Sequence, residues 1–225
     1  VFYPDMDRLF LQCIDSSKCC LFEASLKKDW FDAYNEEEGD WQLPVFGRIL
    51  TKVLGTVAGD ETLTLEATAE SCKLNVVCSR DNDRVKRTFG LPVLASEEEK
   101  LTIPEGDASD AQLSVNCKTL AELLDQVALF DGHVTWKIFN KDDEVELHAS
   151  SENGSIALDV DINEGAGEEG GVSQTFSTQW FRTMSSLAKH CPEATIDFRK
   201  DRPVIMTLPI VEGSHVRFCL SPYTD

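Results

Sequence analysis

The chain has 225 residues, with 40 acidic side chains against 21 basic ones and a formal net charge of −19. On average such a surface repels nucleic acid and anionic membranes, so any contact with DNA has to come from a local basic patch. No apolar run approaches the ~18 residues of a membrane helix, and the expected protein is soluble and intracellular, without a membrane partner. With 42% hydrophobic residues it can bury the core of one large domain or of two domains of about 100 residues each.

The first half of the chain alternates apolar and polar residues at period two, which is typical of strands. Its predicted strands are "RLFLQCI", "CCLFEASL", "ETLTLEATA" and "KLNVVCS". A period near 3.6 predicts one helix in this half, over residues 43–57.

The second half repeats this organisation with two predicted helices, over residues 117–130 and 177–191. Asn153-Gly154 marks a hairpin turn between two of its strands. The predicted strands are "AQLSVN", "VTWKIFN", "EVELHAS", "SIALDVDI", "ATIDFRK", "PVIMTLPI" and "HVRFCLS". The fold class is therefore α+β, rich in strands with a few amphipathic helices.

Similar pieces recur in the same order about 135 residues apart, which indicates two copies of one structural unit. We expect a first domain over residues 1–96, a connector over 97–110 and a second domain over 111–225. The second copy begins with a strand and a helix that have no counterpart in the first. We therefore expect about two dozen residues before Val1, carrying the matching strand and helix.

The helices carry polar faces with basic residues. In the first helix Arg48 and Lys52 lie opposite an apolar stripe that begins at Phe46. In the third helix Arg182 and Lys189 repeat this arrangement, together with Ser185 and Ser186. The middle helix has Lys118 on the matching face but is otherwise acidic there. A solvated helix face is the alternative interpretation for each stripe.

Chemistry-bearing motifs are absent from the sequence. Eight cysteines show no CxxC and no zinc-type spacing with histidine, and buried reduced thiols are typical of a cytosolic or nuclear protein. No nucleophile elbow, phosphate loop or paired-acid motif occurs. We therefore expect neither an enzyme nor a metal or cofactor site.

Several blocks resemble the DNA sliding clamp family, proliferating cell nuclear antigen, in the same order and with similar separations. These blocks are "LFLQCIDSSKCCLFEASL", "FGRIL", "LTIPE", "QTFSTQWF" and "DRPVIMTLPIVEGSHVRFCLSP". The resemblance spans nearly the whole chain and is weak between blocks, so the chain is similar to a divergent member.

The resemblance implies a nuclear, ring-forming protein with two similar β-rich domains per subunit and inner helices. Three identical subunits would enclose duplex DNA without reading its sequence, placed on the DNA by a clamp loader. The implied DNA-facing residues are Arg48, Lys52, Lys118, Arg182 and Lys189. Subunits would join through edge strands at 84–94 and 155–161, with Val85, Arg87, Phe89, Leu91, Ile156 and Leu158 at the interface.

The resemblance also implies a pocket for the short PCNA-interacting peptide of DNA polymerase and other replication and repair proteins. The connector would supply Leu101, Ile103 and Pro104, and the floor would be formed by Ile14, Lys18, Cys19, Leu21, Pro203, Cys219, Ser221 and Pro222. Cys219 stands where the family usually has an aromatic residue, and Lys18 where it has histidine. Such a site would make the protein a processivity factor and a docking platform.

Two other functions fit the sequence. A subunit of a heterotrimeric checkpoint-type clamp would have the same domains without assembling into a homotrimer. An acidic, β-rich protein that mimics DNA would sequester DNA-binding proteins, which the charge of −19 alone permits.

Overall fold

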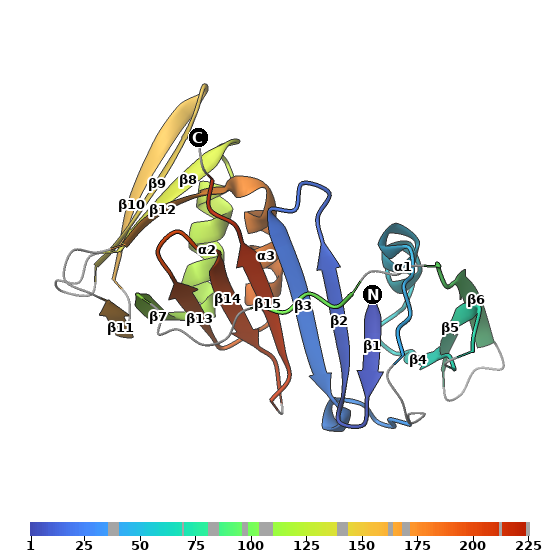
Figure 1. Cartoon of the computed structure of the whole chain (residues 1–225). Coiled ribbons are helices and arrows are strands. Elements are labelled where there is room, and N and C mark those ends of the chain that lie inside the picture. The colour runs from blue at the N-terminus through green and yellow to red at the C-terminus, as the bar shows by residue number, and fades with distance from the viewer. Residues whose placement is uncertain are drawn as a thin grey trace. The chain divides into compact units, whose positions relative to one another are not determined.

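The computed structural model describes residues 1–35, 41–68, 70–80, 86–95, 99–103, 110–138, 144–161, 164–167, 172–211 and 213–223. These residues form two compact units (Figure 1). The first unit comprises Val1–Gln12 and Lys27–Thr102, and the second comprises Cys13–Leu26 and Ile103–Asp225. The segment Cys13–Leu26, near the start of the chain, is thus grouped with the second half of the chain.

The first unit contains an antiparallel hairpin, a three-stranded sheet and one helix. Strands β1 (Phe2–Asp5) and β2 (Arg8–Ile14) form the hairpin. The sheet has the order β4-β5-β6. Its strands are β4 (Thr62–Glu66), β5 (Lys73–Ser79) and β6 (Lys86–Pro92), and the helix is α1 (Gly47–Leu54). A cluster of apolar side chains that includes Phe2, Val53 and Val76 forms the core of this unit.

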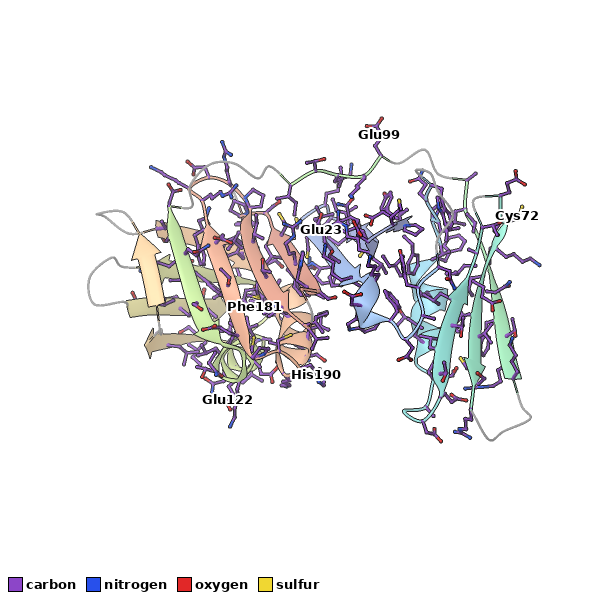
Figure 2. All side chains as sticks on the ribbon, turned by 90° about the horizontal axis from the view of Figure 1, so that it is seen from below. Glu23, Cys72, Glu99, Glu122, Phe181 and His190 are labelled. Atoms are coloured by element: carbon purple, nitrogen blue, oxygen red, sulfur yellow. The ribbon has the colours of Figure 1, made fainter. Side chains whose placement is uncertain are left out.

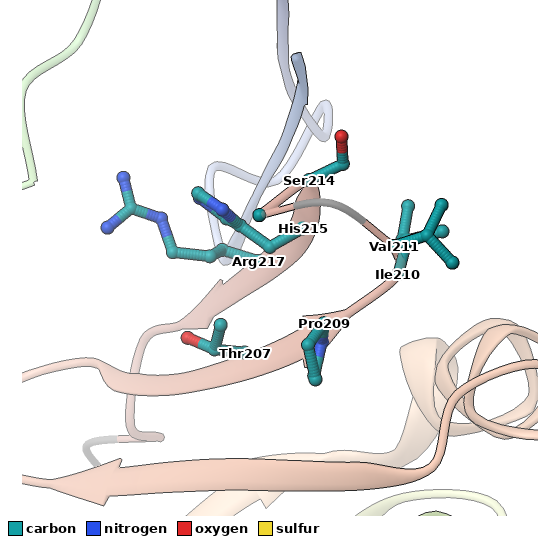
Figure 3. A pocket seen from close by; sticks show the side chains of 8 residues that line it. Thr207, Pro209, Ile210, Val211, Ser214, His215 and Arg217 are labelled. Carbon is teal, nitrogen blue, oxygen red and sulfur yellow. The ribbon is translucent and has the colours of Figure 1, made fainter. Parts of the chain in front are cut away.

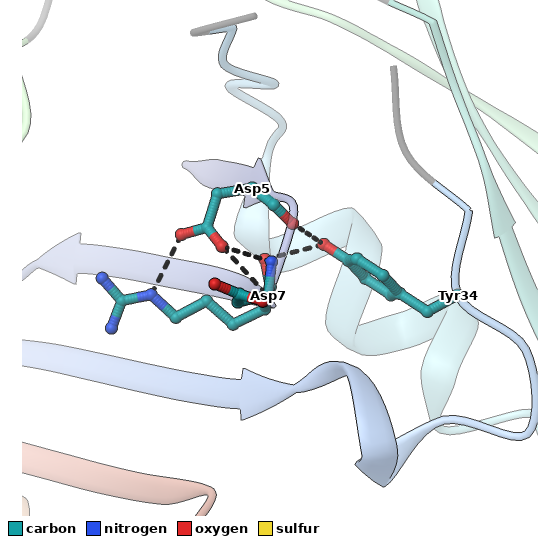
Figure 4. A network of polar contacts seen from close by, with 4 residues as sticks. Asp5, Asp7 and Tyr34 are labelled. Carbon is teal, nitrogen blue, oxygen red and sulfur yellow. Dashed lines mark hydrogen bonds and ion pairs between the residues drawn. The ribbon is translucent and has the colours of Figure 1, made fainter. Parts of the chain in front are cut away.

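A tyrosine fixes the turn of the first hairpin (Figure 4). The Tyr34 hydroxyl lies 2.9 Å from the Asp5 carbonyl oxygen and 2.7 Å from the Arg8 carbonyl oxygen. The Asp5 carboxylate accepts hydrogen bonds from the backbone amides of Asp7 and Arg8 and pairs with the Arg8 guanidinium. The short 3-10 helix η1 (Lys28–Trp30) follows strand β3 (Cys20–Lys27) along the chain. The hydrogen bonds of Tyr34 and Asp5 satisfy backbone groups that a tight turn leaves without strand partners.

The second unit is built from two antiparallel sheets. In one, the strands follow the order β3-β15-β14-β13-β7-β11, and in the other β10-β9-β8-β12. The strands of the first are β3 (Cys20–Lys27), β7 (Ala111–Asn116), β11 (Glu164–Gly167), β13 (Glu193–Phe198), β14 (Val204–Pro209) and β15 (His215–Leu220). Those of the second are β8 (His133–Ile138), β9 (Glu144–Ser151), β10 (Gly154–Asp161) and β12 (Val172–Ser177).

Two helices pack against each other in this unit. They are α2 (Cys117–Val127) and α3 (Phe181–Ala188), the latter preceded by the 3-10 helix η2 (Thr178–Trp180). Figure 2 shows Phe181 on the side of the helices toward the sheet, with Glu122 and His190 on the outer side. The Phe181 ring packs against Trp136 of β8, with ring centroids 6.1 Å apart. The core therefore lies between strands and helices, where apolar burial stabilises the unit.

The predicted α+β, strand-rich fold class is confirmed, and the antiparallel sheets with few helices are consistent with a clamp fold. The helices are shorter than predicted at several ends. Residues 43 and 45 make β-bridges rather than a first helical turn, and α3 begins only after η2. Strand β11 was not predicted, because its Gly- and Glu-rich segment has no apolar alternation.

Candidate functional site

Apolar residues distant in sequence form a row across three strands on one face of the second unit. Leu21 of β3 lies opposite Cys219 of β15, and Cys219 lies opposite Ile205 of β14. Ile103, from the segment between the two halves, packs on this row and is only 8% exposed. We call Leu21, Ile103, Ile205 and Cys219 the Ile103 cluster. Three of these residues were predicted as pocket residues from their resemblance to family blocks.

An aspartate shapes the turn that leads into the cluster. Asp15 Oδ1 accepts hydrogen bonds from the backbone amides of Cys19, at 2.8 Å, and Cys20, at 2.9 Å. Its other carboxylate oxygen accepts from Ser17 Oγ and from Gln179 Nε2, the latter at 3.3 Å. Desolvation raises the pKa of Asp15, but the Ser17 hydroxyl and the two backbone amides together hold the pKa below its ordinary value. A charged Asp15 therefore holds this turn in shape.

The same turn contains a residue in the left-handed region of the backbone. Lys18 has a φ of 58°, and its amide donates to the Asp15 carbonyl oxygen at 3.0 Å. Non-glycine residues are uncommon there, and they persist where surrounding hydrogen bonds over-determine the conformation. The turn thus presents the side chains of Lys18 and Cys19 to solvent in one backbone conformation.

Cys219 behaves as an apolar residue of the cluster. Burial, with a smaller contribution from the Glu23 carboxylate, raises its pKa to about 11. At neutral pH the thiol is therefore protonated and poorly nucleophilic.

The remaining predicted pocket residues lie in varied environments. Ile14, Lys18, Cys19 and Pro203 are exposed, and Ser221 and Pro222 are half-buried. The Ser221 amide donates to the Cys19 carbonyl oxygen at 2.9 Å, which continues the pairing of β15 with β3. Leu101 is 46% exposed and belongs to the first unit, although it lies two residues from Ile103. Pro104 lies outside the described residues.

A hollow of 410 Å³ opens farther along the same strands, at the β14–β15 hairpin (Figure 3). Pro209, His215 and Arg217 are among the residues that line it. The Arg217 guanidinium is bound to the buried Glu23 carboxylate of β3 at 2.8 Å. In register, this ion pair lies two positions along the strands from the Leu21–Cys219 pair. The hollow and the Ile103 cluster share no lining residue.

The predicted basic residues of the first helix are exposed. Arg48 and Lys52 lie on the solvent side of α1, and neither makes an ion pair with a described residue. Phe46 and Ile49, on the apolar stripe of the same helix, are also exposed, at 54% and 46%. The apolar stripe of α1 is therefore only partly covered in this structure.

The basic residues of the second unit take part in contacts between its helices. Lys189 Nζ lies 2.8 Å from Asp125 Oδ2 on α2, and Arg182 Nη2 donates to the Ala128 carbonyl oxygen at 3.3 Å. The hydrogen bond from Lys189 lowers the pKa of the Asp125 carboxylate. Lys118, at the start of α2, is exposed. Ser185, expected on the polar face of α3, is fully buried because α2 covers that side.

The predicted interface strands are outer strands of their sheets among the described residues. They are β6 in the first unit and β10 in the second. Leu91 and Phe89 of β6 pack in the core of their own unit, and Arg87 is bound to Glu61 at 2.6 Å. Ile156 and Leu158 of β10 are half-buried. Val85 lies outside the described residues. A chain that paired with either strand would therefore contact mainly backbone N–H and C=O groups.

Sequence reasoning missed two residues near the Ile103 cluster. Ile205 lies within the continuous apolar run "PVIM", where period-two alternation does not show which residues face outward. Asp15 carried the usual signal of a turn residue, an Asp followed by Ser-Ser, and this signal could have identified its role.

In a comparison with known proteins, no family model matches the chain. A protein named "Proliferating cell nuclear antigen 2", from Drosophila melanogaster, is 22% identical over 222 residues, which cover 95% of this chain and 84% of the relative. This similarity supports a divergent relationship to the sliding clamp family. In the part of the chain that the structure describes, no helix is long and apolar enough to cross a membrane. The same residues contain no group of three or more His, Cys, Asp or Glu side chains arranged to hold a metal ion.

Proposed function

We propose that this chain is a subunit of a nuclear DNA sliding clamp, which encloses duplex DNA and provides a docking site for replication and repair proteins. The observation that carries the proposal is the Ile103 cluster. There the connector residue Ile103 is buried on Leu21 and Cys219, which come from opposite ends of the chain. The similarity to a protein named as a proliferating cell nuclear antigen, which covers 95% of this chain and 84% of that protein, supports the same function.

Enclosure of DNA reconciles the function with the acidic charge. A ring holds DNA topologically, so its contacts can be few, weak and blind to sequence. Arg48, Lys52 and Lys118 are exposed on helices and suited to such contacts. Arg182 and Lys189 would contribute less, because each already contacts α2. Most of the acidic surface would lie on the outside of the ring, where it repels other DNA.

Ring closure would use the two outer strands. An extended strand that adds to a free sheet edge gains main-chain hydrogen bonds, and a heterologous contact of this kind closes a ring when its rotation permits. We propose that β6 of one subunit pairs with β10 of the next, in a homotrimer of two-domain subunits with the boundaries given above. Loading onto DNA would require a clamp loader that opens one such contact.

The docking site would bind a short peptide of the PCNA-interacting kind, as found in DNA polymerase. Burial of its apolar side chains contributes about 25 cal/mol per Å², before the cost of ordering the peptide. The protein would act through this binding and not through chemistry, as a processivity factor. Since Cys219 stands where the resemblance implies an aromatic residue, we expect the peptide preference to differ from that of the family.

Peptide titration tests the docking site directly. A consensus PCNA-interacting peptide should bind the wild type, and Ile103→Ser should weaken binding about tenfold or more, because it removes a buried apolar contact. Ile49→Ser, at an exposed isoleucine of α1, serves as the matched control and should bind like the wild type. Equal binding by Ile103→Ser and the wild type would refute the assignment of the site.

Mass in solution tests the assembly. A species near three times the 25.1 kDa of one chain supports the homotrimer. A stable monomer that assembles only with other clamp-like chains would instead favour the heterotrimeric clamp. Retention on circular but not on linear DNA after loading would exclude a DNA mimic, because only an enclosing ring slides off a free end.

A further inference from the structure

The helix and three strands that end the first unit have counterparts in the second. Helix α1 is followed by the sheet β4-β5-β6, and helix α3 is followed by β13, β14 and β15, which pair in the same order. Both helices span eight residues. The two regions are therefore copies of one arrangement, and the surroundings of one copy indicate what the other can accept.

In the second unit a strand followed by a helix covers this arrangement (Figure 1). Strand β7 pairs with β13 on the side away from β14, and α2, which follows β7 directly, packs against α3. Leu120, Ala121 and Leu124 of α2 are buried, as are Met184 of α3 and Ile196 of β13. One continuous segment thus completes both the sheet and the helix pair.

The copy in the first unit is uncovered among the described residues. Strand β4 pairs with β5, and no described strand pairs with its other edge. The described part of this unit contains no second α-helix to pack on α1. Four apolar side chains are exposed there: Phe46 at 54%, Ile49 at 46%, Leu54 at 38% and Leu63 at 41%. We call these four residues and the outer edge of β4 the open face.

Basic side chains of α3 contact the covering helix in the second unit. Arg182, the second residue of α3, donates to the carbonyl oxygen of Ala128, directly after α2, at 3.3 Å. Lys189, directly after α3, pairs with Asp125 of α2 at 2.8 Å. The covering helix therefore presents its C-terminal carbonyl groups and an acidic side chain to basic residues of its neighbour.

Helix α1 offers basic side chains of the same kind. Arg48 is the second residue of α1, as Arg182 is of α3, and Lys52 lies one turn later. Both Arg48 and Lys52 are exposed. They favour a docked helix that ends beside Arg48 and carries acidic residues. A second copy of the chain fits less well, because two α1 helices would bring their basic residues together.

We propose that the open face is a docking surface for a partner polypeptide that contributes a strand followed by an acidic amphipathic helix. The strand adds to the edge of β4, and the apolar side of the helix covers the exposed apolar residues of α1. The surface lies wholly within the first unit and shares no residue with the Ile103 cluster. Strand β6, proposed for ring closure, is at the opposite edge of the same sheet, so both edges can be paired at once.

Titration of the 225-residue chain with a strand–helix probe tests the proposal. The probe is a synthetic peptide of residues 110–130, because this segment covers the equivalent arrangement in the second unit. It should bind the chain and slow hydrogen exchange at the β4 amides that point away from β5. A control peptide with Leu120→Asp and Leu124→Asp, which lacks the apolar side of the helix, should do neither.

Variants at exposed positions of the chain locate the binding without disturbing the core. Leu63→Asp should weaken the probe about tenfold or more, because it places a charge on the open face. Arg48→Gln should weaken it less, because only the contact with the end of the helix is lost. Val211→Asp, at an apolar residue of the second unit that is 55% exposed, is the matched control and should bind like the wild type.

Each outcome decides the proposal. It is overturned if the wild-type chain does not bind the probe, or if Leu63→Asp binds it equally well. Self-association of the chain that Leu63→Asp abolishes would identify a second copy as the occupant instead. If the protein purified from its natural source carries further residues ahead of Val1 and does not bind the probe, its own chain covers the open face and the proposal of a partner fails.

Discussion

Helices α1 and α3 arise from similar sequence patterns but differ in burial. Phe46, just before α1, and Ile49, within it, correspond in the repeat to Phe181 and Met184 of α3, which lie 135 residues later in the sequence. In α3 both side chains are almost completely buried, at 1% and 0% exposed, whereas in α1 they are about half exposed. The difference coincides with the second helix: α2 packs on α3, and α1 has no such neighbour among the described residues.

An amphipathic pattern therefore specifies which face of a helix is apolar, but not how much of it is buried. The burial of α3 combines contacts with the strands, such as that of Phe181 with Trp136, and contacts with α2, whose Leu120, Ala121 and Leu124 are buried. Apolar burial is the main source of helix stability in a folded protein. The two helices should consequently respond very differently to the same substitution.

The largest expected effect is that of Met184→Ala in α3. Truncation of a fully buried methionine should lower the free energy of unfolding by about 2–5 kcal/mol, from lost burial and the cavity left behind. Ile49→Ala, the matching substitution in α1, should change it by less than about 1 kcal/mol. Urea unfolding followed by circular dichroism measures both. Equal losses would show that something covers the apolar stripe of α1 in solution.

A smaller effect is expected at the beginning of the helices. The Asn116 side chain caps α2 by accepting a hydrogen bond from the Lys118 amide at 3.0 Å, whereas Phe46 makes no side-chain cap for α1. Asn116→Ala should lower the free energy of unfolding by about 1 kcal/mol. Phe46→Asn should add the missing cap and stabilise α1 modestly. If Asn116→Ala unfolds at the same urea concentration as the wild type, the cap contributes nothing.

The smallest effect concerns the ion pair between α2 and α3. Lys189→Ala removes the partner of Asp125, and because both side chains are about half exposed the urea midpoint should fall only slightly. In the folded chain the pKa of Asp125 lies below its ordinary value of 3.8. The ion pair therefore stabilises the fold above pH 3.8, and this stabilisation is lost as the pH falls through the folded pKa. The difference in urea midpoint between Lys189→Ala and the wild type should therefore be larger at pH 7 than at about pH 3. A difference that persists in 1 M salt would contradict an electrostatic origin.

Much of the fold could be predicted from local pattern. Period-two runs indicated most of the strands, and Asn153-Gly154 lies at the predicted turn between β9 and β10. The polar face assigned to α3 was partly wrong, because Ser185 is buried under α2. The sequence pattern of α3 alone does not reveal that α2 packs against it. The burial of Ser185 could therefore not be predicted from sequence.

The docking site was less accessible to sequence reasoning. Leu101 and Ile103 lie two apart and were expected to face the same way in an extended chain. The structure leaves Leu101 half exposed and buries Ile103 against Leu21, Ile205 and Cys219. Gln12 carried no signal, since a single glutamine after a strand-like run is usually a solvated side chain. Its carboxamide nitrogen donates to the Leu101 carbonyl oxygen, 89 residues away.

The pairing of β3 with β15 has a consequence for synthesis of the chain. Glu23 and Arg217, which form the ion pair between these strands, are 194 residues apart. During synthesis β3 emerges early, and it cannot pair with β15 until the residues up to β15 have been made. Contacts this distant in sequence slow folding, and a strand edge left open meanwhile is prone to pair with other chains. We therefore expect the second unit to depend more on chaperones during synthesis than the first.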